Sequence, residues 1–310
     1  MSYLTDVKGI KVGHASNKST GVTVILPPKN TVCSVDVRGG APGTRETDLL
    51  DPQNQVQYSN AVVLSGGSAF GLDASAGVME YLEEHNIGID VGVTVVPIVN
   101  QAVIFDLEFG DSKIRPDKKM GYEACKNASK IESRRGNVGA GISATIGKAI
   151  GNDFAMKSGL GSYTIKKGDL VISALSVVNA FGDIYEDGKQ IAGIYDKKNK
   201  CLLNTASVFD KMIPSFGKNT TISVVATNAK FNKAECKKIS SMAHNGYAMS
   251  IFPVHTLYDG DTIFTLATGE IESDVSVVGS LASIAIKYAI LDAVKSAKSL
   301  NSFPSYDDIQ

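Results

Sequence analysis

Tryptophan is absent from this chain, and cysteine and histidine occur only four times each in 310 residues. The lack of tryptophan disfavours a site that stacks sugars or quaternary ammonium groups on aromatic rings. The cysteines and histidines are scattered and no Cys-x-x-Cys pair occurs, which disfavours a zinc site and a disulfide framework. We therefore expect no metal and reduced, mostly buried thiols at Cys33, Cys125, Cys201 and Cys236.

An excess of charge of either sign is also missing. Lys and Arg total 31 and Asp and Glu total 32, a net charge of −1, so no broad positive field exists for a nucleic acid or an anionic membrane. The first residues lack a basic segment followed by an apolar one, and no run of about 18 apolar residues occurs. We expect a cytoplasmic protein whose function depends on a local site, with neither nucleic acid nor membrane as a partner.

The 30 glycines and the 43% of hydrophobic residues indicate a folded chain with many tight turns. Short β-branched runs predict strands at residues 21–26, 31–37, 61–65, 91–96, 170–178, 220–227 and 262–268. Apolar spacing predicts helices at residues 68–84, 232–250 and 275–297. No repeat or low-complexity linker divides the chain, so we expect a single domain, residues 1–310, with a layered α/β or α+β fold.

Two local signals refine this outline. Asn232 with Glu235 three residues later resembles a capping box at the start of the second helix. Residues 187–204 are mostly polar around a short apolar centre, which indicates a hairpin or a surface loop.

A candidate nucleophile stands where a loop meets a strand. Residues 209–218 have a loop-like composition and run directly into the strand that begins at Thr220. A threonine hydroxyl needs a base, and if the bond between Asn219 and Thr220 is cut, Thr220 gains an α-amino group of pKa about 7.7 that can be this base. Polar loop ends also occur without such chemistry, so the junction alone leaves a structural role open.

Two carboxylates stand two residues apart before another strand, at Asp259 and Asp261. In an extended segment their side chains project to the same side, and two adjacent carboxylates favour a shared proton or a nearby cation. They are therefore candidate proton handlers. A turn built on Asp-Gly, with Asp261 in solvent, is the alternative interpretation.

A series of short motifs carries a family resemblance along nearly the whole chain: KVGH at 11–14, DVRGGAPGTRET at 36–47, LSGGSAFGL at 64–72, VPIV at 96–99, RPD at 115–117, GAG at 139–141, GLGS at 159–162, VNA at 178–180, NTT at 219–221 and DGDT at 259–262. With these motifs the chain resembles the DmpA/NylC family of N-terminal-nucleophile hydrolases. That family includes β-aminopeptidases, an L-aminopeptidase/D-amidase and a 6-aminohexanoate-oligomer hydrolase. The resemblance implies an α+β fold, a four-layer αββα sandwich, and a precursor that cuts itself just before its nucleophile.

The resemblance implies that Thr220 is the nucleophile and that the Asn219–Thr220 bond is cleaved, giving an α-chain of residues 1–219 and a β-chain of residues 220–310. Asp259 and Asp261 match the carboxylate pair of the Thr-type members, whereas the Ser-type aminopeptidases have Ser-x-Glu there. The chain is therefore similar to the oligoamide-hydrolase branch. It departs from the family at Asn228, where the family's Ala-Thr-Asp-Ala strand end has aspartate.

Two further residues match family positions. Asn179 has a side-chain NH₂ that can donate to a developing oxyanion, and the alternative is an asparagine that caps a turn. Lys148 matches a lysine that the family uses near the nucleophile, where a cation would keep the Thr220 amine neutral and Asp259 ionised. A surface lysine is the alternative, and with Lys157 close by the sequence leaves open which lysine points inward.

The glycine-rich segment 65–71 lacks both Gly-x-Gly-x-x-Gly and a phosphate-loop ending, so we expect a tight strand-to-helix turn that lines the substrate cleft, and no cofactor. The sequence thus predicts a self-processing amidohydrolase for peptide-like amide bonds. One alternative is acyl transfer of the ornithine-acetyltransferase type, which usually cuts in an Ala-Thr-Met context. The other is a processing-defective descendant that binds or scaffolds. Family resemblance also implies a homo-oligomer, a tetramer of αβ units, and leaves the preference among L-, D- and β-aminoacyl substrates open.

Overall fold

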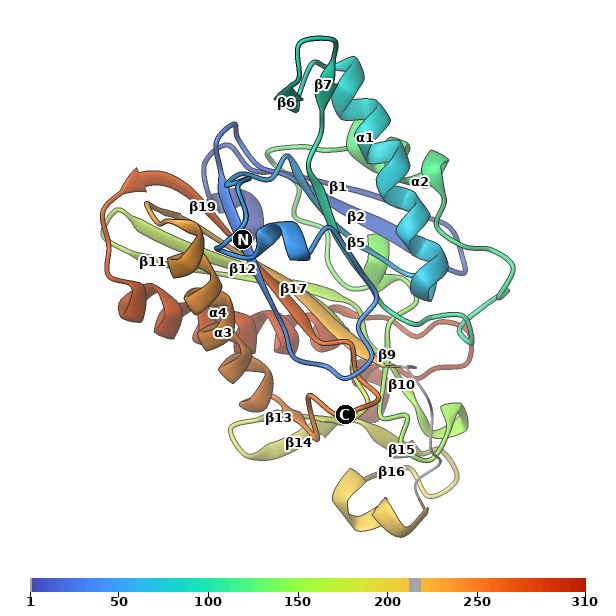
Figure 1. The fold of residues 1–310 in the computed structure, drawn as a ribbon. Helices are drawn as coiled ribbons and strands as arrows, with labels where there is room; N and C mark the ends of the chain where they lie inside the picture. Colours follow the sequence, from blue (N-terminus) through green and yellow to red (C-terminus); the bar gives the residue numbers. More distant parts are fainter. Residues whose placement is uncertain (1, 212–218) are drawn as a thin grey trace.

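The β-branched runs of the sequence pair into two five-stranded sheets in the computed structural model, which describes residues 2–211 and 219–310 (Figure 1). The first sheet has the order β1-β2-β5-β8-β4, with β5 and β8 parallel and the other neighbours antiparallel. Its strands are β1 (Lys11–Ser16), β2 (Gly21–Leu26), β5 (Ala61–Ser65), β8 (Val99–Val103) and β4 (Thr44–Arg45).

The second sheet has the order β11-β12-β17-β19-β3, with β17 and β19 parallel and the other neighbours antiparallel. Its strands are β11 (Leu160–Lys167), β12 (Leu170–Asn179), β17 (Thr220–Ala229), β19 (Thr262–Ile271) and β3 (Val32–Val37). All ten residues of β17 are buried. A strand with both faces covered reads as a nearly continuous apolar and β-branched run, and this one does so from Thr221 to Ala226 with Ser223 as the exception.

Helices cover the outer faces of both sheets (Figure 1). The helices α1 (Ala74–Glu84) and α2 (Lys118–Lys126) pack on the first sheet, and α3 (Lys233–Ala248) and α4 (Val275–Ser296) pack on the second. Between the sheets lies a buried apolar cluster to which both contribute, including Ile25, Leu64, Leu175, Val224 and Phe264. Burial of these side chains is the main favourable contribution to folding.

The helix α4 is long and apolar enough to cross a membrane by length and composition alone. It packs along β11 and β12 and beside α3, and 11 of its 22 residues are buried within the fold. A core helix with this environment passes the same test, and we interpret α4 as one.

Smaller elements complete the described chain. Four small sheets contain β9 (Thr145–Ile146) with β10 (Met156–Lys157), β13 (Asp183–Glu186) with β14 (Lys189–Ala192) and β18 (Ile251–Phe252), β15 (Ile194–Asp196) with β16 (Cys201–Leu203), and β6 (Ile89–Asp90) with β7 (Val95–Val96). Short 3-10 helices are η1 (Leu4–Asp6), η2 (Asp48–Leu50), η3 (Ser68–Asp73), η4 (Gly139–Gly141), η5 (Asn152–Phe154), η6 (Thr205–Lys211) and η7 (Tyr306–Ile309).

Most predicted elements are confirmed with small shifts at their ends. The capping box is present, since Asn232 Oδ1 accepts from the Glu235 N–H at 3.0 Å and Glu235 Oε2 accepts from the Asn232 N–H at 2.8 Å. The predicted strand 91–96 was wrong over most of its length, because residues 91–94 form the turn between β6 and β7. The predicted helix 68–84 begins as η3 and becomes α-helical only at Ala74.

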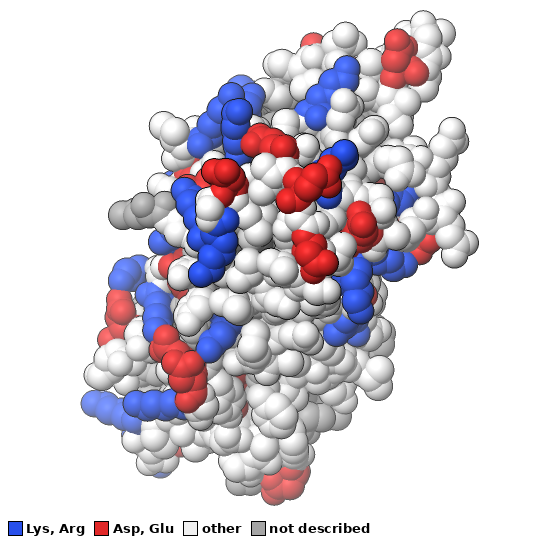
Figure 2. Space-filling model, turned by 90° about the vertical axis from the view of Figure 1, so that its left-hand side faces the viewer, with Lys and Arg blue, Asp and Glu red and all other residues white. Residues whose placement is uncertain are grey.

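The segment 187–204 contains β14 and the β15–β16 hairpin, as expected. The predicted loop 209–218 lies mainly outside the described residues, and the part before residue 212 belongs to η6. Charged side chains of both signs are interspersed on the face shown in Figure 2, with broad neutral areas between them. This distribution agrees with the net charge of −1.

The contact between α1 and α2 depends on two glycines. A Cβ atom added at Gly77 would lie 1.8 Å from the Lys118 carbonyl oxygen, and one added at Gly121 would lie 2.0 Å from the Ala74 carbonyl oxygen. Both obstacles are backbone atoms, so a side chain there would force the helices apart.

We expect Gly77→Ala to lower the free energy of unfolding by about 1–3 kcal/mol, because overpacking at backbone contacts displaces whole elements. Urea denaturation measures this change. The control is Lys119→Ala on the exposed face of α2, which should change the unfolding free energy by less than about 0.5 kcal/mol. Equal unfolding midpoints for the two variants would contradict the close packing.

Candidate active site

The predicted site residues meet at one edge of the second sheet. Thr220 is the first residue of β17, and it pairs with Asn179, the last residue of the antiparallel strand β12. On the other side of β17, Asn219 forms a parallel bridge with Asp259, just before β19 begins. The two loop-to-strand junctions singled out by the sequence are therefore adjacent in space.

The Thr220 hydroxyl lies directly against the peptide bond that precedes it. Thr220 is buried, and its Oγ1 donates a hydrogen bond to the Asn219 carbonyl oxygen. The same oxygen accepts from the backbone N–H of Gly260 at 3.1 Å. The Asn219 side chain is fully buried, and neither its Nδ2 nor its Oδ1 finds a hydrogen-bond partner among the described residues.

Asp261 connects the start of β17 to a histidine. Its Oδ1 accepts from the Thr221 N–H at 2.8 Å, and its Oδ2 accepts from the His255 N–H at 3.1 Å and lies 2.8 Å from His255 Nδ1. The carboxyl group is buried, so these partners replace the water that a buried charge requires. Asp261 thereby fixes the backbone next to Thr220.

Asp259 has a different set of partners. Its Oδ2 accepts from the Thr256 N–H at 3.0 Å and from the Thr256 hydroxyl at 2.6 Å. Burial, together with the nearby Asp261 charge, raises the pKa of Asp259 to about 7, although hydrogen bonds from Thr256 and the Phe181 backbone oppose the rise. The solvent-exposed alternative predicted for the Asp-Gly turn is wrong, because both carboxylates are buried.

Lys148 contacts Asn179. Its Nζ lies 2.9 Å from Asn179 Oδ1 and 3.3 Å from the Asn179 carbonyl oxygen. Asn179 Oδ1 also accepts from the Thr145 N–H at 3.0 Å, and the side-chain NH₂ donates to the Phe105 carbonyl at 3.0 Å. The orientation of the Asn179 amide is thus fixed.

The sequence could not choose between Lys148 and Lys157, and the structure buries both. Lys157 Nζ donates to the Gly141 and Ala144 carbonyls at 3.1 and 3.0 Å, and burial lowers its pKa to about 7. Lys157 therefore holds the turn at η4, whereas Lys148 is the lysine that contacts Asn179. The surface-lysine interpretation of Lys148 is wrong.

A pocket of about 430 Å³ opens at Thr220. It is lined by small and apolar residues of four segments: Gly40, Ala41, Pro42, Gly43, Ser68, Ala69, Val103, Phe105 and Thr220. The glycine-rich turn after β5 lines this pocket through Ser68 and Ala69, as the sequence predicts. No side chain among these lining residues is ionisable.

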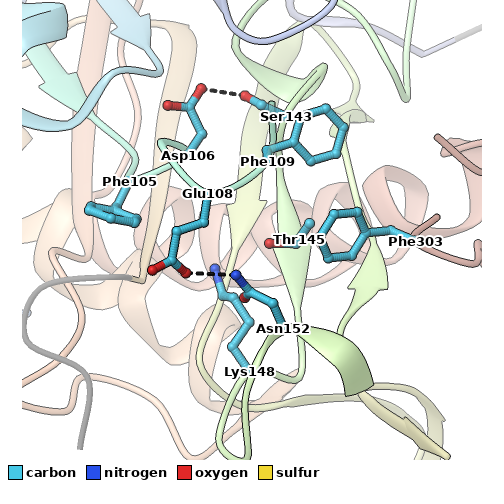
Figure 3. A pocket seen from close by; sticks show the side chains of 9 residues that line it. All are labelled: Phe105, Asp106, Glu108, Phe109, Ser143, Thr145, Lys148, Asn152 and Phe303. Atoms are coloured by element: carbon cyan, nitrogen blue, oxygen red, sulfur yellow. Dashed lines mark hydrogen bonds between the residues drawn. The ribbon is translucent and has the colours of Figure 1, made fainter. Parts of the chain in front are cut away.

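Phe105 also borders a second, smaller cavity, which Lys148, Thr145 and Asp106 help to line (Figure 3). There Glu108 Oε2 accepts from Asn152 Nδ2 at 2.6 Å, and the Lys148 side chain extends toward this pair. Asp106 Oδ2 accepts from the Ser143 hydroxyl at 2.5 Å, and Asp106 Oδ1 accepts from the Gly67 N–H at 2.6 Å. Asp106 thus anchors the glycine-rich turn that lines the Thr220 pocket.

Sequence reasoning missed His255, Gly260, Asp106 and Phe105. Gly260 stands between the two aspartates and His255 stands four residues before Asp259, so proximity in sequence to the aspartates was the available signal. Phe105 and Asp106 follow β8, which is fully buried. Its polar residues Asn100 and Gln101 interrupt the apolar pattern, so the sequence did not predict this strand.

Comparisons with known proteins identify the family of the chain. The model of peptidase family S58 matches residues 2–305. An uncharacterized aminopeptidase of Mycobacterium leprae is 40% identical over 99% of this chain and 93% of its own length. A 6-aminohexanoate-oligomer endohydrolase of Paenarthrobacter ureafaciens is 31% identical over 94% of this chain and 82% of its own length.

Two solved structures share the fold. The L-aminopeptidase D-Ala-esterase/amidase of Ochrobactrum anthropi, described as a variant of the Ntn hydrolase fold, matches with a TM-score of 0.75 and 16% identity, over 98% of this chain and 88% of that one. A β-aminopeptidase of Burkholderia matches with a TM-score of 0.72 and 17% identity, over 96% and 87%. Together with the family match, these similarities show that the chain belongs to peptidase family S58, the family of the DmpA/NylC type, and is a hydrolase of peptide or amide bonds with an Ntn-hydrolase-like, mixed α and β fold.

Proposed function

We propose that this chain is a self-processing amidohydrolase in which Thr220 becomes an N-terminal nucleophile. One observation carries the proposal: the buried Thr220 hydroxyl contacts the carbonyl of its own preceding peptide bond, at the wall of a pocket. An acyl shift requires the hydroxyl oxygen to lie close to the carbonyl carbon, and the contact of Thr220 Oγ1 with the Asn219 carbonyl, whose oxygen also accepts from the Gly260 N–H, supports this step.

Self-cleavage proceeds by an N-to-O acyl shift. Thr220 Oγ1 attacks the Asn219 carbonyl carbon, the C–N bond breaks, and the proton of the hydroxyl passes to the departing Thr220 nitrogen. Water then hydrolyses the ester: its OH joins the Asn219 carbonyl carbon and its proton returns to Oγ1. The products are an α-chain of residues 1–219 and a β-chain of residues 220–310.

The mature enzyme repeats this chemistry on its substrate. The free Thr220 amine takes the hydroxyl proton, Oγ1 attacks the substrate carbonyl, the leaving amine is protonated, and water releases the acyl group. Asn179 donates to the oxyanion of the substrate, and Lys148 holds the Asn179 amide in its orientation. Asp261 positions the start of β17 by accepting from the Thr221 N–H. Asp259, whose pKa is raised to about 7, determines the charge beside this strand start.

The substrate is a small peptide or amide. The names of the relatives, an aminopeptidase and an oligoamide endohydrolase, support this class, and the uncharged lining of the Thr220 pocket supports an acyl group held by shape. A screen of L-, D- and β-aminoacyl anilides against short oligoamides would identify the preferred acyl group.

The proposal includes a four-layer αββα sandwich in a single domain, and a cytoplasmic homo-oligomer of αβ units that needs no cofactor. The helix pairs on the outer faces of the two sheets support the layer order.

We expect the wild-type chain to appear in denaturing electrophoresis as fragments of roughly 23 and 10 kDa, a division of 32.7 kDa in proportion to length. Thr220→Ala should give only the full-length chain and no hydrolysis, because the attacking oxygen is gone. The matched control is Thr221→Ala, which removes a neighbouring hydroxyl that has no hydrogen-bond partner among the described residues and should still be cleaved. Cleavage of Thr220→Ala, or an intact and active wild-type chain, would refute the proposal.

The Asp259 carboxyl should make stability depend on pH. Its pKa is about 7 in the folded chain, whereas the ordinary value is 3.8, so its stabilising contribution is complete below about pH 3.8 and is lost as the pH rises through 7. The test compares the double variant Thr220→Ala/Asp259→Asn with the single variant Thr220→Ala. The melting temperature of the double variant minus that of the single variant should be larger at pH 8 than at pH 5.

The control for this comparison is Asp187→Asn. The Lys287 ammonium lowers the pKa of Asp187, so its contribution is already complete at pH 5 and the corresponding difference should be the same at both pH values. Differential scanning calorimetry gives the melting temperatures. If the melting-temperature difference for Asp259→Asn is also the same at both pH values, the folded chain does not hold a proton on Asp259.

His255 should act as a positioning residue through Nδ1. It has φ of +57°, a conformation that asparagine tolerates well, and the Nδ2 of asparagine occupies nearly the place of His Nδ1. His255→Asn should therefore keep most of the self-cleavage rate, whereas His255→Gln should slow it by about 10-fold or more through loss of a charge-assisted hydrogen bond. Time courses of fragment formation measure both, and equal rates would assign His255 no such role.

A further inference from the structure

We infer that self-cleavage and substrate turnover use different oxyanion donors, and that the backbone N–H of Gly260 is the donor for self-cleavage. This inference rests on the proposed function and extends it to a backbone N–H, which belongs to a residue without a side chain. It separates two reactions that share one nucleophile.

The Asn219 carbonyl is held in place on both sides. The Asn219 N–H donates to the Tyr258 carbonyl at 3.3 Å, and the Asn219 carbonyl accepts from the Gly260 N–H at 3.1 Å, which makes Asn219 the last link of the parallel pairing between β17 and β19. When Thr220 Oγ1 attacks, negative charge grows on this carbonyl oxygen. The Gly260 N–H is already directed at it, so no reorganisation is needed at the moment of reaction.

Asn179 is directed elsewhere in the uncleaved chain. Lys148 Nζ and the Thr145 N–H both bind its Oδ1, and this fixes its NH₂ toward the Phe105 carbonyl at 3.0 Å. Phe105 lines the Thr220 pocket, where a substrate would enter. The Asn179 NH₂ therefore donates to the Phe105 carbonyl in the uncleaved chain, whereas the Gly260 N–H donates to the Asn219 carbonyl.

The identity of residue 260 fits this role. A Cβ atom added at Gly260 would lie 2.8 Å from Thr220 Oγ1 and 2.8 Å from the Ala41 carbonyl oxygen. A side chain would therefore crowd the attacking oxygen even though it leaves the N–H in place. For this reason Gly260→Ala cannot test the hydrogen bond, and the N–H itself must be replaced.

The decisive experiment replaces the Gly260 amide by an ester. An expressed fragment of residues 1–235 is joined at Cys236 to a synthetic segment of residues 236–310 that carries glycolic acid at position 260, and refolding starts the reaction. We expect self-cleavage to be about 10²–10³-fold slower than in an identically assembled all-amide chain. Equal rates, with circular dichroism showing that both chains fold, would overturn the inference.

A second arm decides the question if the ester chain fails to fold. Asn179→Asp in the expressed fragment keeps the oxygen that accepts from Lys148 and Thr145 and removes the NH₂. We expect self-cleavage within about 3-fold of the all-amide chain, while hydrolysis of alanyl, β-alanyl and 6-aminohexanoyl anilides falls by about 10²-fold.

The outcomes of the two arms separate the inference from the proposal beneath it. A self-cleavage rate that falls about 10²-fold in Asn179→Asp would show a shared donor and overturn the inference. Failure of the all-amide chain to cleave, or cleavage of an assembled Thr220→Ala chain, would instead refute the proposed function.

Discussion

The arrangement of the site depends on the parallel pairing of β17 with β19. Parallel neighbours begin at the same edge of a sheet, so Thr220 at the start of β17 lies close to the aspartates that precede β19. The antiparallel strand β12 ends at this edge, which adds Asn179. A single strand register thus brings together a hydroxyl, a carboxylate pair and an amide from three distant parts of the sequence, and a slip of β17 by one residue would turn Thr220 to the opposite face of the sheet.

Burial then determines the chemistry of these groups. A charged group away from water must find partners or change its protonation state. Asp261 finds three donors in Thr221 and His255, whereas Asp259 lies beside the Asp261 charge and its pKa rises to about 7. Two aspartates two residues apart therefore meet burial in different ways: Asp261 accepts hydrogen bonds from Thr221 and His255, and the pKa of Asp259 is raised.

The sequence predicted the elements that a simple pattern controls, such as the buried strands at Thr220 and Thr262 and the capping box at Asn232. It also placed the candidate site residues at strand ends. Contacts across the fold were beyond it: the approach of His255 to Asp261 depends on a loop with a positive φ, and two buried lysines look alike until their carbonyl partners are known. The departure at Asn228 has a similar explanation, because its amide both accepts from the Val171 N–H and donates to the Asp169 carbonyl, which an aspartate could not do.

The side-chain amide of Asn219 destabilises the uncleaved chain, because it is buried and has no hydrogen-bond partner among the described residues. Leaving such a group without partners inside a protein costs about 1–3 kcal/mol for each polar atom. Scission would turn Asn219 into a carboxyl terminus that is free to move toward water, and the new charge would make a return to the dry interior still less favourable. Religation would then be opposed both by hydration of the new carboxylate and by renewed burial of the Asn219 amide, so that cleavage at this bond would be effectively irreversible.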